Sequence, residues 1–245
     1  SPGKRGRGAP CGFATMTPRV AASIISRSLG ASPRATLGGW QAQVVHRLTA
    51  GQAHRRGLVK SIVVSAAEED GYAAQIRATV AAHLRRASTL REQGIKVLSL
   101  FFLDRVAAYA GDDGEARIIF DQCFEELAQG VPGFDGLPAS AVRSAYFATR
   151  SGRAVDSKTG RSAADAEAYT LILQDKPRLL SLDEPVSFVF SHSALREGWD
   201  NPNVFVMGML KKSDNTVSRR QEIGRGLRLA VDQHGERMDN PVVVH

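Results

Sequence analysis

Two arginines three residues apart, Arg225 and Arg228, are the residues of this chain best suited to chemistry. They stand in a short run with Gly224, which we predict to be helical. Three residues are close to one helical turn, so both guanidinium groups are expected to project to the same side. Holding such a pair together without an anion is costly, and guanidinium forks match phosphate oxygens bidentately. The spacing therefore predicts a site for a nucleotide triphosphate.

A second segment of interest reads Arg196-Glu197-Gly198-Trp199-Asp200-x-Pro202 and follows an apolar stretch, residues 186–190, that we predict to be a buried strand. Gly198 would let the main chain approach a ligand, and Asp200 can accept a hydrogen bond from a ribose hydroxyl or from an arginine of the first segment. An ordinary strand-to-helix turn with a capping Asp would give the same pattern. Ligands of open α/β sheets bind at the carboxyl ends of the strands, so we expect this segment to lie there.

Both segments resemble conserved motifs of superfamily 2 helicases. Gln221-x-x-Gly224-Arg225-x-x-Arg228 is similar to motif VI, and the segment 196–202 is similar to motif V. The sequence around them resembles the restriction (Res) subunit of type III restriction-modification enzymes more closely still. Two further stretches, residues 94–106 and 175–185, share that similarity. The resemblance covers roughly residues 68–245 and nothing before them.

The resemblance implies a second RecA-like helicase lobe, which is an α/β fold with a doubly wound, mostly parallel sheet and an irregular insertion. It assigns an arginine-finger role to Arg225 and Arg228. The residues implied on the nucleotide side are Gly198, Asp200, Gln221 and Gly224. On the DNA side they are Ser193 and Arg196, although Ser193 also fits a plain turn serine.

The whole enzyme implied by the resemblance is a cytoplasmic, ATP-dependent endonuclease acting on double-stranded DNA together with a modification (methyltransferase) subunit. ATP and Mg²⁺ would be bound mainly by a first lobe, because this sequence contains no G-x-x-x-x-G-K-[ST] phosphate-binding loop. We therefore expect the chain to be a fragment, truncated at its carboxyl end and inactive alone. Two alternatives stay open: another superfamily 2 DNA or RNA helicase, and a non-catalytic fragment that binds nucleic acid weakly.

Charge divides the chain near residue 67. The net charge is +7, but residues 1–67 hold 10 Lys and Arg and no acidic residue, so the rest is slightly acidic. This basic, Gly- and Ser-rich quarter has the composition of a flexible extension. A nucleic-acid-binding arm or a transit peptide fits it too. We predict that residues 1–67 are unstructured or extraneous and that the lobe occupies residues 68–245.

Periodicity from residue 68 onward predicts alternating helices and strands. Helices are expected at 68–92, 118–127, 163–174 and 215–229, and strands at 95–102, 186–190, 203–209 and from 241. Residues 129–158 are rich in Gly, Pro and Ser and are expected to form the extended insertion.

Several site classes fit the sequence poorly. The two cysteines and six histidines lack the spacing of a disulfide framework or a zinc site, so no metal site is expected. No apolar run reaches the ~18–20 residues of a membrane-spanning helix. Leu179–Glu184 imitates a magnesium-binding DExx strand, but it stands at the wrong place relative to motif V.

Overall fold

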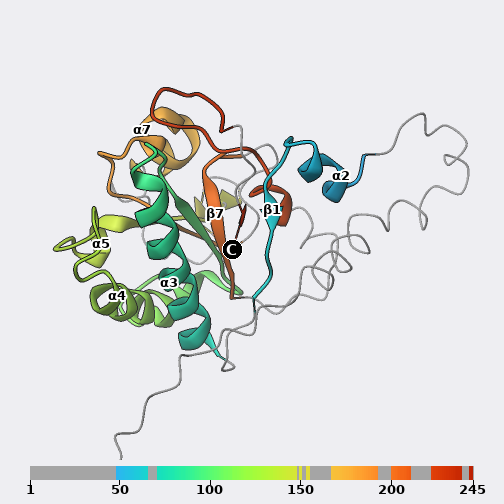
Figure 1. Ribbon diagram of the computed structural model, residues 1–245. Helices are drawn as coiled ribbons and strands as arrows, with labels where there is room; N and C mark the ends of the chain where they lie inside the picture. The colour runs from blue at the N-terminus through green and yellow to red at the C-terminus, as the bar shows by residue number, and fades with distance from the viewer. Residues whose placement is uncertain are drawn as a thin grey trace, which may run out of the picture.

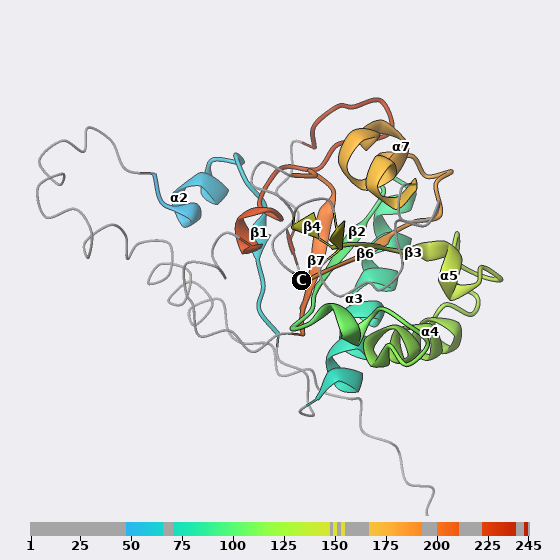
Figure 2. The ribbon, with the colours of Figure 1, turned by 180° about the vertical axis from the view of Figure 1, so that it is seen from behind.

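The computed structural model describes residues 48–65, 71–147, 149–150, 153–154, 167–192, 200–210, 222–238 and 243–244. Its centre is a four-stranded sheet in the order β3-β6-β2-β7, in which every neighbouring pair is parallel. The strands are β2 (Leu98–Phe102), β3 (Arg143–Tyr146), β6 (Phe188–Ser191) and β7 (Val204–Met209). Figures 1 and 2 show this sheet from two opposite sides.

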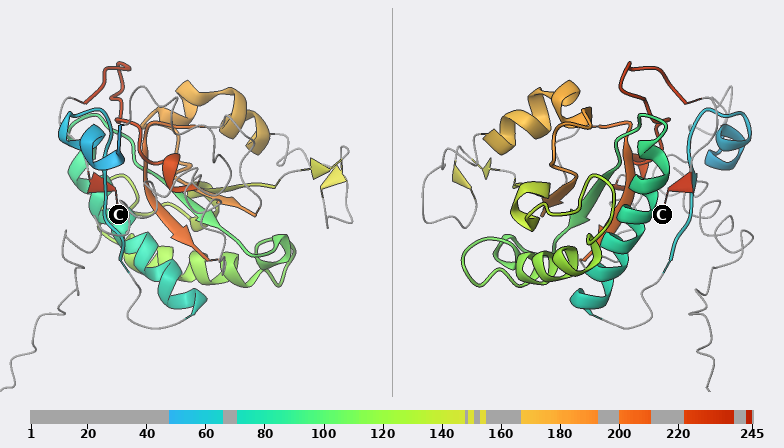
Figure 3. Two further views of the ribbon diagram at one scale, coloured as in Figure 1. Left: turned by 90° about the vertical axis from the view of Figure 1, so that its right-hand side faces the viewer. Right: turned by 60° about the vertical axis from the view of Figure 1, so that its left-hand side comes forward.

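Helical layers cover both faces of the sheet (Figure 3). Helices α3 (Tyr72–Arg91) and α4 (Glu115–Leu127) pack on one face, over an aromatic core that includes Phe101, Phe188 and Phe190. On the other face, a π-helical turn η3 (Thr170–Gln174) and the helix α7 (Lys176–Leu180) cover Leu98, Leu100 and Phe102. Because β2 is apolar toward both layers, it is buried along its whole length. The α/β, RecA-like architecture expected from the sequence is confirmed.

Local sequence explains the boundaries of the first helix–strand unit. The helix α3 ends before Gly94, whose φ of 67° is left-handed, and the amide of Ile95 donates to the carbonyl of Leu90. This is a helix stop for which glycine is the usual residue. The chain then enters β2 directly. The predicted strands at 186–190 and 203–209, the helix at 118–127 and the strand from 241 are also confirmed, with shifted ends.

The insertion differs from its prediction. Residues 143–146 are an edge strand, β3, which follows the short helix α5 (Ala139–Val142) and pairs with β6. Its first three residues are partly exposed and include Arg143, whose guanidinium contacts Asp121 of α4 at 2.6 Å. An edge strand needs no continuous apolar run, so this strand could not be recognised from a sequence as polar as residues 143–146. Two short strands, β4 (Thr149–Arg150) and β5 (Arg153–Ala154), form a separate antiparallel pair.

Residues 48–65, which the sequence placed in the amino-terminal extension, form a helix and a strand, and the strand pairs with the carboxy-terminal part of the chain. Helix α2 (Ala50–Arg55) begins with a capping box formed by Thr49 and Gln52. Strand β1 (Ser61–Ile62) then pairs in parallel with β8 (Val243–Val244), and β8 contacts β7. The lack of acidic residues says nothing about main-chain hydrogen bonding, and it is main-chain pairing with β8 that holds this segment to the lobe. Residues 1–47 lie outside the described residues, as does the predicted start of α3.

Within the described part of the chain, no helix is long and apolar enough to cross a membrane.

Candidate functional site at the amino edge of the sheet

Asp200 is the centre of a three-residue ion cluster. Its Oδ1 accepts from Nζ of Lys176 at 3.0 Å, and its Oδ2 is paired with Nη2 of Arg228. Burial by itself would raise the pKa of Asp200, but the bonds with the two cations outweigh it and hold the pKa below its ordinary value. In this structure Asp200 thus pairs with Arg228, and Lys176 is a second cation that the sequence did not point out.

Lys176 is placed by a short but well-anchored helix. The side chain of Asp175 caps α7 by accepting from the amide of Arg178 at 3.1 Å, Pro177 stands in the first turn, and Leu179 is fully buried. This anchoring fixes the backbone of Lys176 in front of Asp200.

The loop that carries Arg228 is tied to the same edge by polar bonds. Asn203 exchanges two bonds with the main chain of Val231, both of 2.8 Å. Gln233 bridges to α7, because it donates to the carbonyl of Leu180 and accepts from the amide of Leu182, each at 2.9 Å. The loop 227–233 is thus fastened to both segments that carry the other two members of the ion cluster, Asp200 and Lys176.

Arg225 and Arg228 do not share one helix face. Helical conformation ends at residue 224, and the amides of Arg225 and Gly226 make turn bonds three residues back, to the carbonyls of Glu222 and Ile223. Arg225 is half-buried in that turn, whereas Arg228 is exposed in the loop beyond it. The predicted helix 215–229 is therefore wrong at its end. Gly224 is exposed, with open space where a side chain would stand.

The site also lies at a different edge from the one expected. The carboxyl end of β6 leads to His192, whose Nε2 lies 2.8 Å from the carbonyl of Asp104 beyond the end of β2. Asp200, in contrast, stands just before the amino end of β7. Because the strands are parallel, residues that precede one strand meet those that precede its neighbours. Ser193, Arg196, Gly198 and Gln221 lie outside the described residues.

Lys60 fastens the amino-terminal segment beneath this site. Its amide donates to the carbonyl of Leu227, and its fully buried ammonium donates to the carbonyls of Pro202 and Val204 at 2.5 and 2.7 Å. The ammonium also lies over the ring of Phe205, 4.2 Å from its centroid. Burial, with Arg86 nearby, lowers the pKa of Lys60 to about 7. One side chain thus contacts the main chain on both sides of Asn203.

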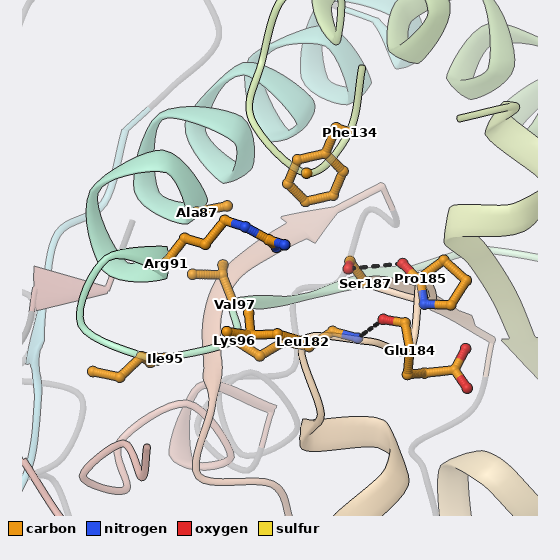
Figure 4. A pocket seen from close by; sticks show the side chains of 11 residues that line it. Ala87, Arg91, Ile95, Lys96, Val97, Phe134, Leu182, Glu184, Pro185 and Ser187 are labelled. Carbon is orange, nitrogen blue, oxygen red and sulfur yellow. Dashed lines mark hydrogen bonds between the residues drawn. The ribbon is translucent and has the colours of Figure 1, made fainter. Parts of the chain in front are cut away.

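A second buried lysine stands at the same edge (Figure 4). Nζ of Lys96 donates to the carbonyl of Glu184, while the carboxylate of Glu184 turns away and binds Nε of Arg178 at 2.7 Å. The small cavity beside them, about 30 Å³ in volume, has room for a water molecule rather than a nucleotide. Glu184 is thus engaged with a cation.

Comparison with curated proteins relates the chain to three bacterial and phage enzymes. It is 36% identical over 172 residues to the type III restriction-modification enzyme StyLTI Res subunit of Salmonella typhimurium, covering 59% of this chain and 17% of that protein. The EcoPI Res subunit of Escherichia phage P1 and the EcoP15I Res subunit of Escherichia coli are 35% and 37% identical over 155 residues, covering 57% of this chain and 15% of each relative. The chain is therefore similar to type III Res subunits over somewhat more than half of its own length. No protein-family model matches the chain.

The chain spans about a sixth of the length of these Res subunits. The amino edge of its sheet contains three contributors that sequence reasoning left out, namely Lys60, Lys176 and Gln233. Lys176 stands inside a stretch already noted for its resemblance to Res subunits, and Lys60 is a lone charge in a mostly apolar run, residues 58–64. That single charge was the one feature of the sequence that could have pointed to a buried role for Lys60. Nothing in the sequence pointed to Gln233.

Proposed function

We propose that this Res-subunit relative supplies the arginine-bearing half of an ATPase site in an ATP-dependent, DNA-translocating endonuclease. The observation that carries the proposal is the Arg228 guanidinium, 63% exposed at the edge of the sheet and held by the carboxylate of Asp200. A carboxylate and a phosphate present similar pairs of oxygens to a guanidinium fork. Asp200 therefore holds Arg228 in an orientation that an incoming phosphate can take over.

Catalysis in such a site depends on positive groups that are held where negative charge develops in the transition state. Arg228, with Arg225 in the preceding turn, would stabilise the γ-phosphoryl group as it is transferred to water. Gly198, Gln221 and Gly224 would line the nucleotide side of the same loop cluster. The phosphate-binding loop would come from another lobe, since this sequence contains none. The described residues also include no group of three His, Cys, Asp or Glu side chains that could hold a metal ion, so the ligands of the implied Mg²⁺ would lie elsewhere.

DNA would be bound at the opposite edge. The carboxyl ends of β2 and β6 deliver Asp104 and His192, and the implied DNA contacts Ser193 and Arg196 follow directly in the sequence. Separate edges for nucleotide and DNA would let ATP turnover change the DNA contact through the chain that joins them. The partners on this proposal are double-stranded DNA and a modification subunit.

The test replaces the residue equivalent to Arg228 by Ala in a full-length Res subunit that retains this motif. ATP turnover is expected to fall on the order of 10³-fold, the scale typical of arginine fingers, while ATP affinity changes far less. Lys should not restore turnover, because a point charge cannot reproduce the bidentate fork. DNA cleavage should fall in parallel.

The matched control is the equivalent of Arg178→Ala, which removes an exposed arginine bound to Glu184 at the same edge. It should leave turnover nearly unchanged. Near-normal turnover of the Arg228 variant would overturn the proposal. The 245-residue chain by itself is expected to hydrolyse no ATP, and DNA-stimulated hydrolysis that is lost on Arg225→Ala would show that its site is complete.

A further inference from the structure

The carboxylate of Asp200 has a separate cation on each oxygen. Lys176 occupies Oδ1 and Arg228 occupies Oδ2, and they come from segments on either side of Asp200 in the sequence. Two positive charges therefore share one negative charge, and the cluster carries a net charge of +1. An ion pair with a single arginine would be neutral and self-contained, whereas this arrangement leaves one cation in excess.

The two cations differ in how firmly they are held. Arg228 is the more exposed, with 63% of its side chain accessible against 41% for Lys176, and it extends from an irregular loop. Lys176 projects from the capped helix α7, whose Leu179 is buried in the core. Of the two, Arg228 is the one that can change partner without moving a packed element.

If Arg228 leaves Asp200 to bind a phosphate, the carboxylate of Asp200 loses one of its two cations. Exposed ion pairs contribute little to stability, so Arg228 can leave Asp200 at little cost. Asp200 would then stand as an unpaired anion close to the incoming phosphate, and like charges at such distances repel. A cation that remains on the other oxygen removes that repulsion.

We propose that Lys176 is a third basic residue of this half-site, which stays on Asp200 and neutralises it when Arg228 turns from Asp200 to the phosphates. The inference rests on the proposed function, since it needs a polyphosphate ligand for Arg228. Lys176 is on this account a positioning residue. It contacts Asp200 and not the reacting atoms.

Gln233 holds the loop of Arg228 in a fixed position relative to Lys176. Its two bonds of 2.9 Å join this loop to Leu180, at the end of α7, and to Leu182 just beyond it. Asn203 joins the same loop to the segment that carries Asp200, again by two bonds. The three backbones therefore move together, and the side chain of Arg228 alone has to turn.

The experiment titrates the full 245-residue chain with inorganic tripolyphosphate and follows single side chains by NMR. The guanidinium Nε–Hε signal of Arg228 reports the exchange, and the carboxyl carbon of Asp200 reports its pKa. In the unaltered chain, tripolyphosphate should shift the Arg228 signal while the pKa of Asp200 stays at or below its ordinary value. The variant Lys176→Met should bind tripolyphosphate about fivefold more weakly, the upper end for one exposed pair. The pKa of Asp200 should rise above ordinary in its complex.

Two further variants separate positioning from plain structural support. Lys176→Arg keeps the charge and should restore both readouts. Arg178→Met removes a similarly exposed cation from the same helix, which pairs with Glu184 instead, and should leave both unchanged.

Each contrary outcome has a distinct meaning. Unchanged tripolyphosphate binding and an unchanged Asp200 pKa in Lys176→Met would overturn this inference and leave the proposed function standing. A shift of the Lys176 signals while Arg228 stays on Asp200 would overturn it too, because Lys176 would then be the phosphate ligand. No response at Arg228 in the unaltered chain would overturn both.

Discussion

The two edges of the sheet are built from different kinds of bonds. At the amino edge, buried Lys60 and Lys96 donate to main-chain carbonyls. At the carboxyl edge, the corresponding contacts are partly exposed: the hydroxyl of Tyr72 donates to Asp104, and His192 meets the carbonyl of the same residue. A buried polar group that loses its partner costs far more than an exposed one, which water can satisfy. Stability should therefore depend on the amino edge much more than on the carboxyl edge.

The contrast also bears on the ion cluster. Asp200, Lys176 and Arg228 are partly exposed, yet Asp200 stands two residues before Pro202, whose carbonyl the buried Lys60 binds. The amino edge thus combines a rigid base with cations that can change partners. Such a combination suits a site whose charges must be pre-arranged and still exchange with a ligand.

The largest effect is expected from Lys60→Met. Met keeps the apolar stem but leaves the carbonyls of Pro202 and Val204 without their buried donor, so the free energy of unfolding should fall by about 3 kcal/mol. Urea denaturation of the full chain measures this. Arg56→Met, an exposed position of the same segment, should change stability by less than about 0.5 kcal/mol. A loss below about 1 kcal/mol for Lys60→Met would mean that the amino edge does not depend on this bond.

A smaller effect concerns pH. Burial lowers the pKa of Lys60 to about 7 from 10.5, so between those values the unfolded chain binds more protons than the folded chain. Stability should consequently rise as the pH increases from 7 to 9, by up to about 1.4 kcal/mol per pH unit from this group. Burial likewise lowers the pKa of Lys96 to about 8 and adds to the slope. Denaturation midpoints at several pH values should show a flatter slope in Lys60→Met. An unchanged slope would contradict the assignment.

The smallest effect is expected at the other edge. Tyr72→Phe keeps the ring and removes only the exposed hydrogen bond to Asp104, so stability should change by less than about 0.5 kcal/mol. Thermal and urea denaturation of this variant and of His192→Ala provide the measurement. Losses as large as that of Lys60→Met would erase the distinction between the edges.

Sequence reasoning found the central elements because their signals are local. The helix α3 is marked by apolar residues at helical spacing and by Gly94 at its end, and β2 by an unbroken apolar run. β3 carries no such mark, because an edge strand with Arg143 at its start buries little. The segment 48–65 was missed for a related reason: its place is set by pairing with β8 near the other end of the chain.

For the candidate site, the sequence by itself predicted which residues could bind a phosphate, since Gly224, Arg225 and Arg228 stand at a specific spacing and follow Asp200 in a recognisable order. Only the tertiary structure decided which of them meet. It placed Arg228 on Asp200, set Arg225 in a turn apart from it, brought Lys176 into the cluster, tied the loop to α7 through Gln233, and set the cluster at the amino edge. These contacts join residues 24 to 53 positions apart. Local spacing fixes the direction of a side chain only within one helix or strand, whereas contacts at such separations depend on how the parallel strands pack against one another.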